Sequence, residues 1–200
     1  MRAPVLLALV SLAGCFGHES APARFFVLSP TVRPEPSAAA SAASDGALAV
    51  GPAQVPDYLD RPQIVTFRSA NEIAIDEFRR WGEPTSSAVA RVVASDLQAL
   101  LPSWVVVVKP WDPTVPVRAR LVLAVDELGW DQAGEARLEG TWTLLAGSSG
   151  SAAASGHVSL RRRAASASAD AGAATSSELL GELARTIASH VRQLPPAAAR

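Results

Sequence analysis

The stretches VRARLVLAVDEL, residues 117–128, and ARLEGTWTLL, residues 136–145, decide the fold, because each alternates apolar and polar side chains. Successive side chains of a β-strand point to opposite faces, so a period of two indicates a strand with one buried face. Gly129 and Gly134 lie in a polar turn between the stretches, which predicts an antiparallel hairpin. The inward-facing residues are Val117, Ala119, Leu121, Leu123, Val125, Leu138, Trp142 and Leu144.

Shorter runs on both sides of this hairpin extend the predicted sheet. They are β-branched, aromatic or alternating, and turn residues separate them, which is typical of strands. Together with the hairpin they predict a mixed or antiparallel sheet of six to eight strands. The expected ranges are 24–28, 47–55, 64–67, 72–76, 104–108 and 157–161.

Residues 85–101 carry apolar side chains at the spacing of an α-helix. The first three of them, Thr85, Ser86 and Ser87, offer hydroxyl oxygens as N-caps, and Pro102 ends the segment. The apolar stripe consists of Val89, Val93, Leu97 and Leu100.

Residues 176–194 form a second predicted helix. Thr175 and Glu178 are spaced as in a capping box, and two prolines follow the segment. Because helices with one apolar face pack on a sheet, the chain predicts a two-layer α+β fold with two long helices. The stripe of this helix consists of Leu180, Leu183, Ile187, Val191 and Leu194.

Length and composition favour a single domain. The chain has 200 residues, of which 48% are hydrophobic, and 18 basic residues stand against 19 acidic ones. A nucleic-acid partner is not expected, since it would need a concentrated basic face. Two Ala/Ser-rich segments, near residues 31–45 and 164–174, are expected to be flexible loops within a domain that spans residues 24–196.

The first residues have the character of an export signal. Arg2 precedes an apolar run at residues 5–12, and the chain continues Leu12-Ala13-Gly14-Cys15, with the only cysteine of the protein. This box resembles the lipobox of bacterial lipoproteins. The resemblance implies cleavage of residues 1–14, a diacylglycerol and an acyl chain on Cys15, and a tether over residues 15–23. The alternative is an incidental cysteine after a hydrophobic start.

The residue after the cysteine bears on location. In enteric-type sorting an aspartate there retains a lipoprotein at the inner membrane, and this chain has Phe16. The resemblance therefore implies the periplasmic face of the outer membrane.

The sequence offers no recognisable catalytic or metal-binding motif. His18, His157 and His190 each lack a second ligand at metal spacing, and nucleophile-elbow, P-loop, dinucleotide-binding and HExxH patterns are absent. We therefore expect neither an enzyme nor a cofactor. The basic run at residues 161–163 is either a solvated strand end or a contact for lipid headgroups or an acidic partner. Trp81 is either a hydrophobic staple for the first helix or an interface anchor.

Several blocks in order along the chain resemble one family. They are Gly51-Pro52, PDYLDRPQIV at residues 56–65, WGEP at 81–84, LPSWVV at 101–106, EGTW at 139–142 and a final helix that ends in Leu194-Pro195. Together they resemble the PqiC-type auxiliary lipoproteins of ABC-type transport systems over nearly all of residues 15–196.

The resemblance implies a non-enzymatic partner of an MCE-domain tunnel protein, which docks on or caps the tunnel at the outer membrane as a ring-shaped homo-oligomer. The signature positions map to Pro56, Asp57, Tyr58, Leu59, Arg61, Pro62, Gln63, Trp81 and Pro84. They either form a surface for a partner or another subunit, or they only stiffen a turn of the fold.

Two other functions remain open at this stage. A module that itself binds a lipid or another hydrophobic ligand would need an apolar cavity of roughly 300 Å³ or more between sheet and helices. A hydrolase would need Ser, His and Asp side chains to converge in a cleft.

Overall fold

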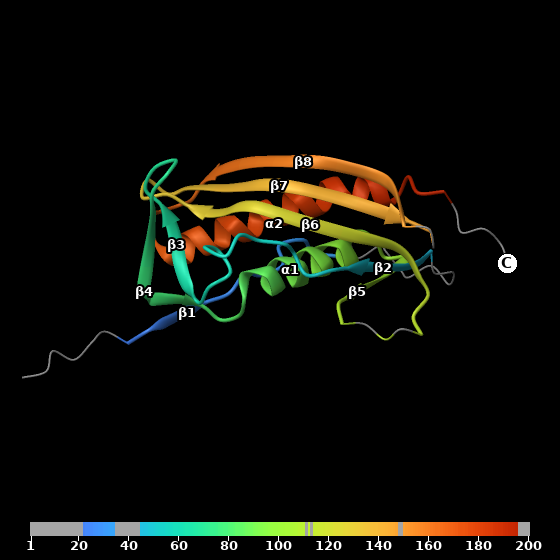
Figure 1. The fold of residues 1–200 in the computed structure, drawn as a ribbon, viewed down its shortest axis with the longest axis horizontal. Helices are drawn as coiled ribbons and strands as arrows, with labels where there is room; N and C mark the ends of the chain where they lie inside the picture. The colour runs from blue at the N-terminus through green and yellow to red at the C-terminus, as the bar shows by residue number, and fades with distance from the viewer. Residues whose placement is uncertain (1–21, 35–44, 111, 113, 148–149, 196–200) are drawn as a thin grey trace, which may run out of the picture.

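A computed structural model describes residues 22–34, 45–110, 112, 114–147 and 150–195. Cys15, the predicted leader before it and most of the 31–45 segment lie outside the described residues. Within them the chain forms two helices and eight strands, which confirms the predicted α+β class (Figure 1). The elements are β1 Arg24–Phe26, β2 Gly46–Val50, β3 Gln63–Phe67, β4 Ile73–Trp81, α1 Thr85–Leu100, β5 Trp104–Val108, β6 Val117–Trp130, β7 Glu135–Ala146, β8 Ser151–Arg163 and α2 Ala169–Val191.

The strands divide into two sheets instead of lying in one. The larger sheet has five strands in the order β5-β2-β6-β7-β8, and the smaller has three in the order β1-β4-β3. β6, β7 and β8 pair antiparallel, whereas β2 lies parallel to both β5 and β6. The predicted hairpin is thus confirmed, and the mixed pairing follows from the long connections that bring β2 beside β5 and β6.

A bulge in β6 changes which side chains face inward. From Ala119 to Val125 the odd-numbered residues are buried, as the alternation predicts. The register with β7 shifts between Val125 and Glu127, and beyond it Leu128 and Trp130 are buried instead. An extra residue in one strand reverses the facing of all that follows. Because of the bulge, side chains at both ends of this long strand are buried in the core.

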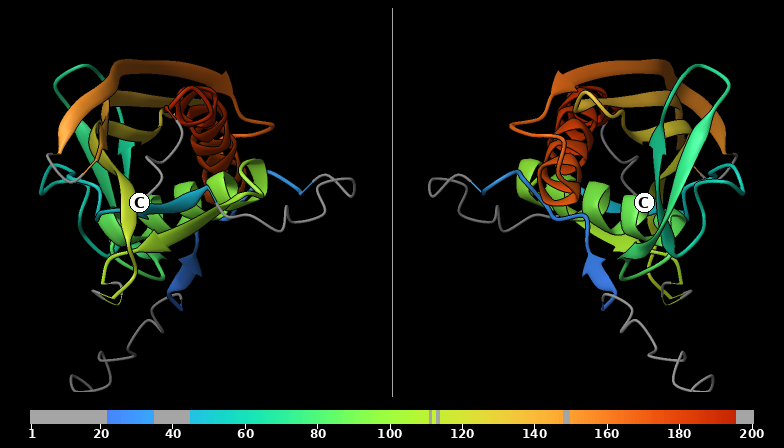
Figure 2. Two further views of the ribbon diagram at one scale, coloured as in Figure 1. Left: turned by 90° about the vertical axis from the view of Figure 1, so that its right-hand side faces the viewer. Right: turned by 90° about the vertical axis from the view of Figure 1, so that its left-hand side faces the viewer.

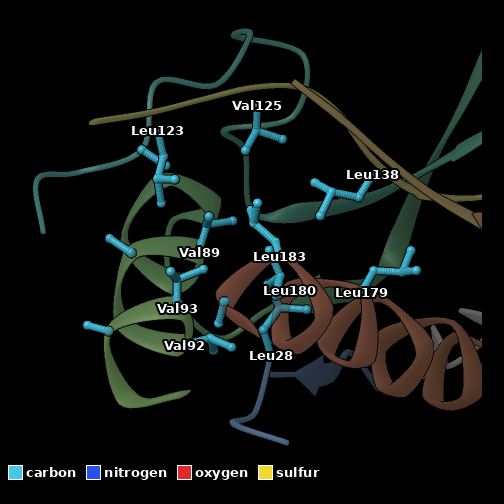
Figure 3. Packing of buried hydrophobic residues seen from close by; sticks show 14 of the residues in the cluster. Leu28, Val89, Val92, Val93, Leu123, Val125, Leu138, Leu179, Leu180 and Leu183 are labelled. Carbon is cyan, nitrogen blue, oxygen red and sulfur yellow. The ribbon is translucent and has the colours of Figure 1, made fainter. Parts of the chain in front are cut away.

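Both helices cover the same side of the larger sheet, which curls over α2 (Figure 2). Their facing sides are filled by branched apolar side chains that interdigitate with those of β6 and β7 (Figure 3). Leu180 and Val93 are fully buried there, as the helical stripes predict. Burial of this apolar surface is the main force that holds the layers together.

The second helix begins earlier than predicted. α2 starts at Ala169, with the hydroxyl of Ser168 accepting from the Ala171 N–H at 3.2 Å, so the expectation of a loop over residues 164–174 is wrong for its second half. Thr175 is not a cap, because it lies inside the helix and donates to the Ala171 carbonyl at 2.9 Å. Alanine has the highest helix propensity, and an Ala/Ser-rich composition alone does not separate a loop from a helix.

The segment that follows β1 is fastened across both helices. Leu28 is buried, and the Ser29 N–H donates to the Ser177 hydroxyl of α2 at 3.1 Å. The N–H groups of Thr31 and Val32 both donate to Asp96 Oδ1 of α1 at 2.9 Å. We refer to residues 28–32 as the strap. Asp96 has no exposed surface, and its burial raises the pKa of its carboxyl, against the lowering effect of the two N–H donors.

Candidate functional site

Residues 56–63 form a compact turn at one corner of the fold. The N–H groups of Leu59 and Asp60 both donate to the Pro56 carbonyl, at 2.8 and 3.2 Å. Leu59 points into the core and is 3% exposed. We call this turn, together with Trp81 and Pro84, the signature corner. The structure thus brings together the residues that the sequence analysis selected from two separate blocks.

The signature corner caps the N-terminus of α1. Thr85 donates its hydroxyl to the Leu59 carbonyl at 2.8 Å, and Asp60 accepts from both the N–H and the hydroxyl of Ser86 at 3.0 Å. The expectation that hydroxyls of residues 85–87 cap the helix is wrong, because the N-cap position is Pro84. A carboxylate at a helix N-terminus satisfies free N–H groups and interacts favourably with the helix dipole.

Replacing Asp60 with alanine is therefore expected to lower the free energy of unfolding by about 1 kcal/mol, the usual cost of a lost N-cap. Asp57→Ala is the matched control, because Asp57 lies exposed in the same turn and its carboxylate makes no hydrogen bond or ion pair with the described residues. Urea unfolding followed by circular dichroism measures both. Equal stability of the two variants would contradict the capping role.

The other side of the signature corner is joined to the smaller sheet. The Trp81 N–H donates to the Pro62 carbonyl at 2.7 Å, and Gln63 Nε2 donates to Glu77 at 3.3 Å. The Trp81 ring meets Trp130 edge-on, with 6.3 Å between ring centroids. Trp81 ends β4 and is not adjacent to the N-cap, so the hydrophobic-staple interpretation is wrong.

Tyr58 connects the signature corner to the bulge of β6. Its hydroxyl donates to the Asp126 carbonyl at 2.9 Å. Burial, followed by the charges of Glu127 and Asp126, raises the pKa of Tyr58, so the hydroxyl stays protonated and keeps donating. Arg61 is half-buried, and its Nε has no acceptor among the described residues.

The outward side of the signature corner includes three exposed signature residues. Asp57, Pro62 and Pro84 are exposed, whereas their neighbours are fastened to α1, β4 and β6. The structure therefore gives Leu59, Tyr58 and Trp81 contacts within the fold and leaves Asp57, Pro62 and Pro84 as the surface on which the predicted interface would depend.

A groove of about 570 Å³ lies beside the smaller sheet, between β4 and the start of α2. Its charged lining residues are Arg68, Asp76, Glu77, Arg79 and Asp131, with Ile64 and Trp130 among the apolar ones. The space between the larger sheet and the helices, where a lipid-binding module would need its cavity, is occupied by the side chains of Figure 3. Because charged groups are costly to desolvate against a hydrocarbon chain, the charged lining of this groove does not favour the binding of a lipid tail.

Two of the histidines and one arginine of the basic run contact other side chains of the same chain. His157 Nε2 lies 3.6 Å from Glu139, and the ring of His190 lies 5.0 Å from that of Trp142. No group of three or more potential metal ligands occurs in the part of the chain that the structure describes. Arg162 pairs with Glu178 at 3.0 Å and Glu182 at 2.9 Å on α2, so this part of the basic run joins β8 to the helix.

The part of the chain that the structure describes contains the helices α1 and α2. Neither of them combines the length and the apolar character that crossing a bilayer requires.

Solved structures share this fold at low sequence identity. A crystal structure of a protein of unknown function covers 86% of this chain and 99% of its own, with a TM-score of 0.70 and 18% identity. A protein from Xanthomonas campestris covers 85% of this chain and 98% of its own, with a TM-score of 0.68 and 19% identity. The PelC dodecamer protein from Paraburkholderia phytofirmans is more distant, with a TM-score of 0.45, 15% identity and coverage of 76% and 89%.

Sequence comparison identifies the family. No curated protein matches the chain significantly. The family described as ABC-type transport auxiliary lipoprotein component matches residues 26–188, which include the signature corner, α1 and all of α2 except its last three residues. This match confirms the resemblance seen in the sequence blocks, and the family is one of transport components, not of enzymes. The chain therefore belongs to the ABC-type transport auxiliary lipoprotein components.

Proposed function

We propose that this protein is a lipid-anchored periplasmic subunit of an MCE-type system for lipid transport between membranes. It docks on or caps the MCE-domain tunnel at the outer membrane and acts without catalysis. The observation that carries the proposal is membership of the auxiliary lipoprotein family together with the lipobox at residues 12–15. An auxiliary component acts through a transporter, and the signature corner supplies a surface for one.

The anchor is the lipid on Cys15. One acyl chain gives only marginal membrane binding, whereas a diacylglycerol with a further acyl chain holds a protein lastingly. Phe16 in place of an aspartate supports delivery to the outer membrane.

The partner surface is the outward side of the signature corner. Its turn is held by the Asp60 cap and by the Pro62 bond to β4, so Pro62 and Pro84 are presented in one fixed arrangement. A preorganised surface loses little conformational entropy on binding. The same surface suits contact with the tunnel protein or with a neighbouring subunit of a ring-shaped homo-oligomer.

Replacing Cys15 with serine is expected to abolish lipidation, leaving the protein unprocessed in the inner membrane or soluble. Membrane fractionation and mass spectrometry of the N-terminal peptide measure this outcome. Normal outer-membrane fractionation of the variant would refute the anchor. The parent protein, whose peptide should carry the lipid mass, is the control.

The partner surface is tested by photo-crosslinking in cells. A photoreactive amino acid at Pro62 or Pro84 should yield a covalent adduct with an MCE-domain protein or with a second copy of this chain. The matched control is the same amino acid at Val122, an exposed residue of β6. Adducts from Val122 but none from the two proline positions would reject the signature corner as the interface.

A further inference from the structure

Exposed apolar side chains gather on the smaller sheet. Among the described residues six large hydrophobic side chains are exposed, and four of them lie on β1, directly after it, or on β4. Phe25 is 67% exposed and Phe78 is 50% exposed. These four are Phe25, Val27, Ile75 and Phe78. Apolar residues gathered on a surface indicate a contact with a membrane or another protein.

The two phenylalanines are held on neighbouring strands. β1 and β4 pair parallel, with Phe25 opposite Arg80, two residues beyond Phe78. Phe78 lies in a bulge of β4, because Ile64 of β3 pairs with Asp76 while the adjacent Gln63 pairs with Arg80.

Asp76 fixes the shape of this bulge. Its Oδ1 accepts from the N–H groups of Phe78 and Arg79, both at 2.9 Å. A bulge redirects side chains away from the regular pleat. The exposure of Phe78 is therefore a fixed property of the strand and not a frayed end.

The charges around the phenylalanines are nearly balanced. Arg79 lies 3.5 Å from Asp76, and Arg80 lies 3.8 Å from Glu77. Arg24 stands over the ring of Phe26 at 5.3 Å. Apolar side chains flanked by paired charges suit the interfacial zone of a bilayer, where rings enter the apolar boundary and guanidinium groups meet headgroups.

The position of these side chains along the chain supports a bilayer as their partner. Seven residue steps separate Cys15 from Pro22, the first described residue, and a chain spans at most about 3.6 Å per residue, or roughly 25 Å in total. β1 begins two residues later, at one end of the molecule beside β4 (Figures 1 and 2). A bilayer that holds the lipid of Cys15 is thus within reach of Phe25 and Phe78.

We infer that Phe25 and Phe78 insert into the interfacial zone of the phospholipid bilayer that holds the anchor, so that the smaller sheet faces the membrane. This inference rests on the proposed lipidation of Cys15. The lipid fixes the protein to the membrane, and the two rings fix its orientation.

Quenching by brominated lipids tests the orientation in the lipidated full-length protein. Because the sulfur of Cys15 is consumed by the lipid, a cysteine introduced at residue 78 or 105 can be labelled alone with the fluorophore NBD. Val105 is the matched control, since it is also 50% exposed but lies on β5 of the larger sheet. The probe is a vesicle of phosphatidylethanolamine and phosphatidylglycerol with brominated acyl chains.

We expect quenching at residue 78 to be at least about threefold stronger than at residue 105, because the interfacial zone lies only roughly 5–10 Å into the bilayer. Adding Phe25→Ser should weaken the quenching at residue 78, whereas adding Val122→Ser should not. Both replaced side chains are exposed, so the fold should tolerate either change.

The outcomes separate the two proposals. If the labelled proteins float with vesicles but residues 78 and 105 are quenched equally, the inferred orientation is wrong and the anchor stands. If they do not float, the anchor fails and the orientation fails with it. Shielding of the label at residue 78 that grows with protein concentration in the absence of vesicles would identify a second copy as the occupant and overturn the inference.

Discussion

Replacing Gly140 with alanine is expected to lower the free energy of unfolding by roughly 3 kcal/mol or more, at the upper end of the cost of overpacking. Gly140 lies in β7 opposite the bulge of β6. A Cβ atom there would lie 2.2 Å from the Ala124 carbonyl oxygen and 3.0 Å from the Val125 Cα. Both are backbone atoms of the paired strand, so relief requires that β6 and β7 move apart.

Gly51→Ala is the control, because a Cβ at Gly51 would find its nearest neighbour at 3.9 Å, an ordinary contact. That variant should stay within about 0.5 kcal/mol of the parent protein. Urea unfolding at neutral pH, followed by tryptophan fluorescence, compares the two. A parent-like midpoint for Gly140→Ala would show that the bulge of β6 does not constrain this position.

Asp96→Ala is expected to lower the free energy of unfolding by about 2–4 kcal/mol, because it leaves the N–H groups of Thr31 and Val32 without an acceptor. Asp96→Asn keeps an oxygen for these donors and removes the charge, so it should be much closer to the parent. A loss of equal size in both variants would contradict the role of the strap bonds.

The difference in stability between the parent protein and the Asp96→Asn variant should depend on pH, and the sign of this dependence can be predicted. Because burial raises the pKa of Asp96 above its unfolded value, the protonated carboxyl stabilises the fold below pH of about 4, and this contribution is lost as pH rises through the folded pKa. The stability of the parent relative to Asp96→Asn should therefore fall from acidic to neutral pH. Unfolding measured across that range checks the sign, and a relative stability that rises with pH would refute it.

Patterns within a single element could be predicted from the sequence. The alternation in residues 117–145 predicted the central hairpin because one face of each strand is buried and the other is not. The same logic located α1, whose stripe from Val89 to Leu97 is buried as expected.

Features that join distant segments could not be predicted in this way. The cap of α1 comes from Asp60, which is 26 residues away from Ser86. β1 pairs with β4, although the two strands lie far apart in the sequence. Both belong to the smaller sheet, which is separate from the larger one. Local periodicity contains no information about either contact.

One omission and one error of the sequence analysis had a signal in the sequence. Asp96 lies three residues after Val93 and directly before Leu97, on the apolar side of α1, and a carboxylate at that position indicates a buried partner. The alanines of residues 169–174 favour a helix by propensity, and Ser168 before them is a good N-cap. The loop was predicted there from the Ala/Ser-rich composition, although the helix propensity of alanine favours a helix.

The strap also determines how mechanical load enters the domain. Any pull transmitted along the chain from the N-terminal side reaches β1 first and then residues 28–32, whose bonds lead to Asp96 of α1 and Ser177 of α2. Tension is thereby shared between the two helices at the centre of the core before it can reach the long strands. The chain that enters the domain at the edge strand β1 is thus fastened to both helices of the core directly after that strand.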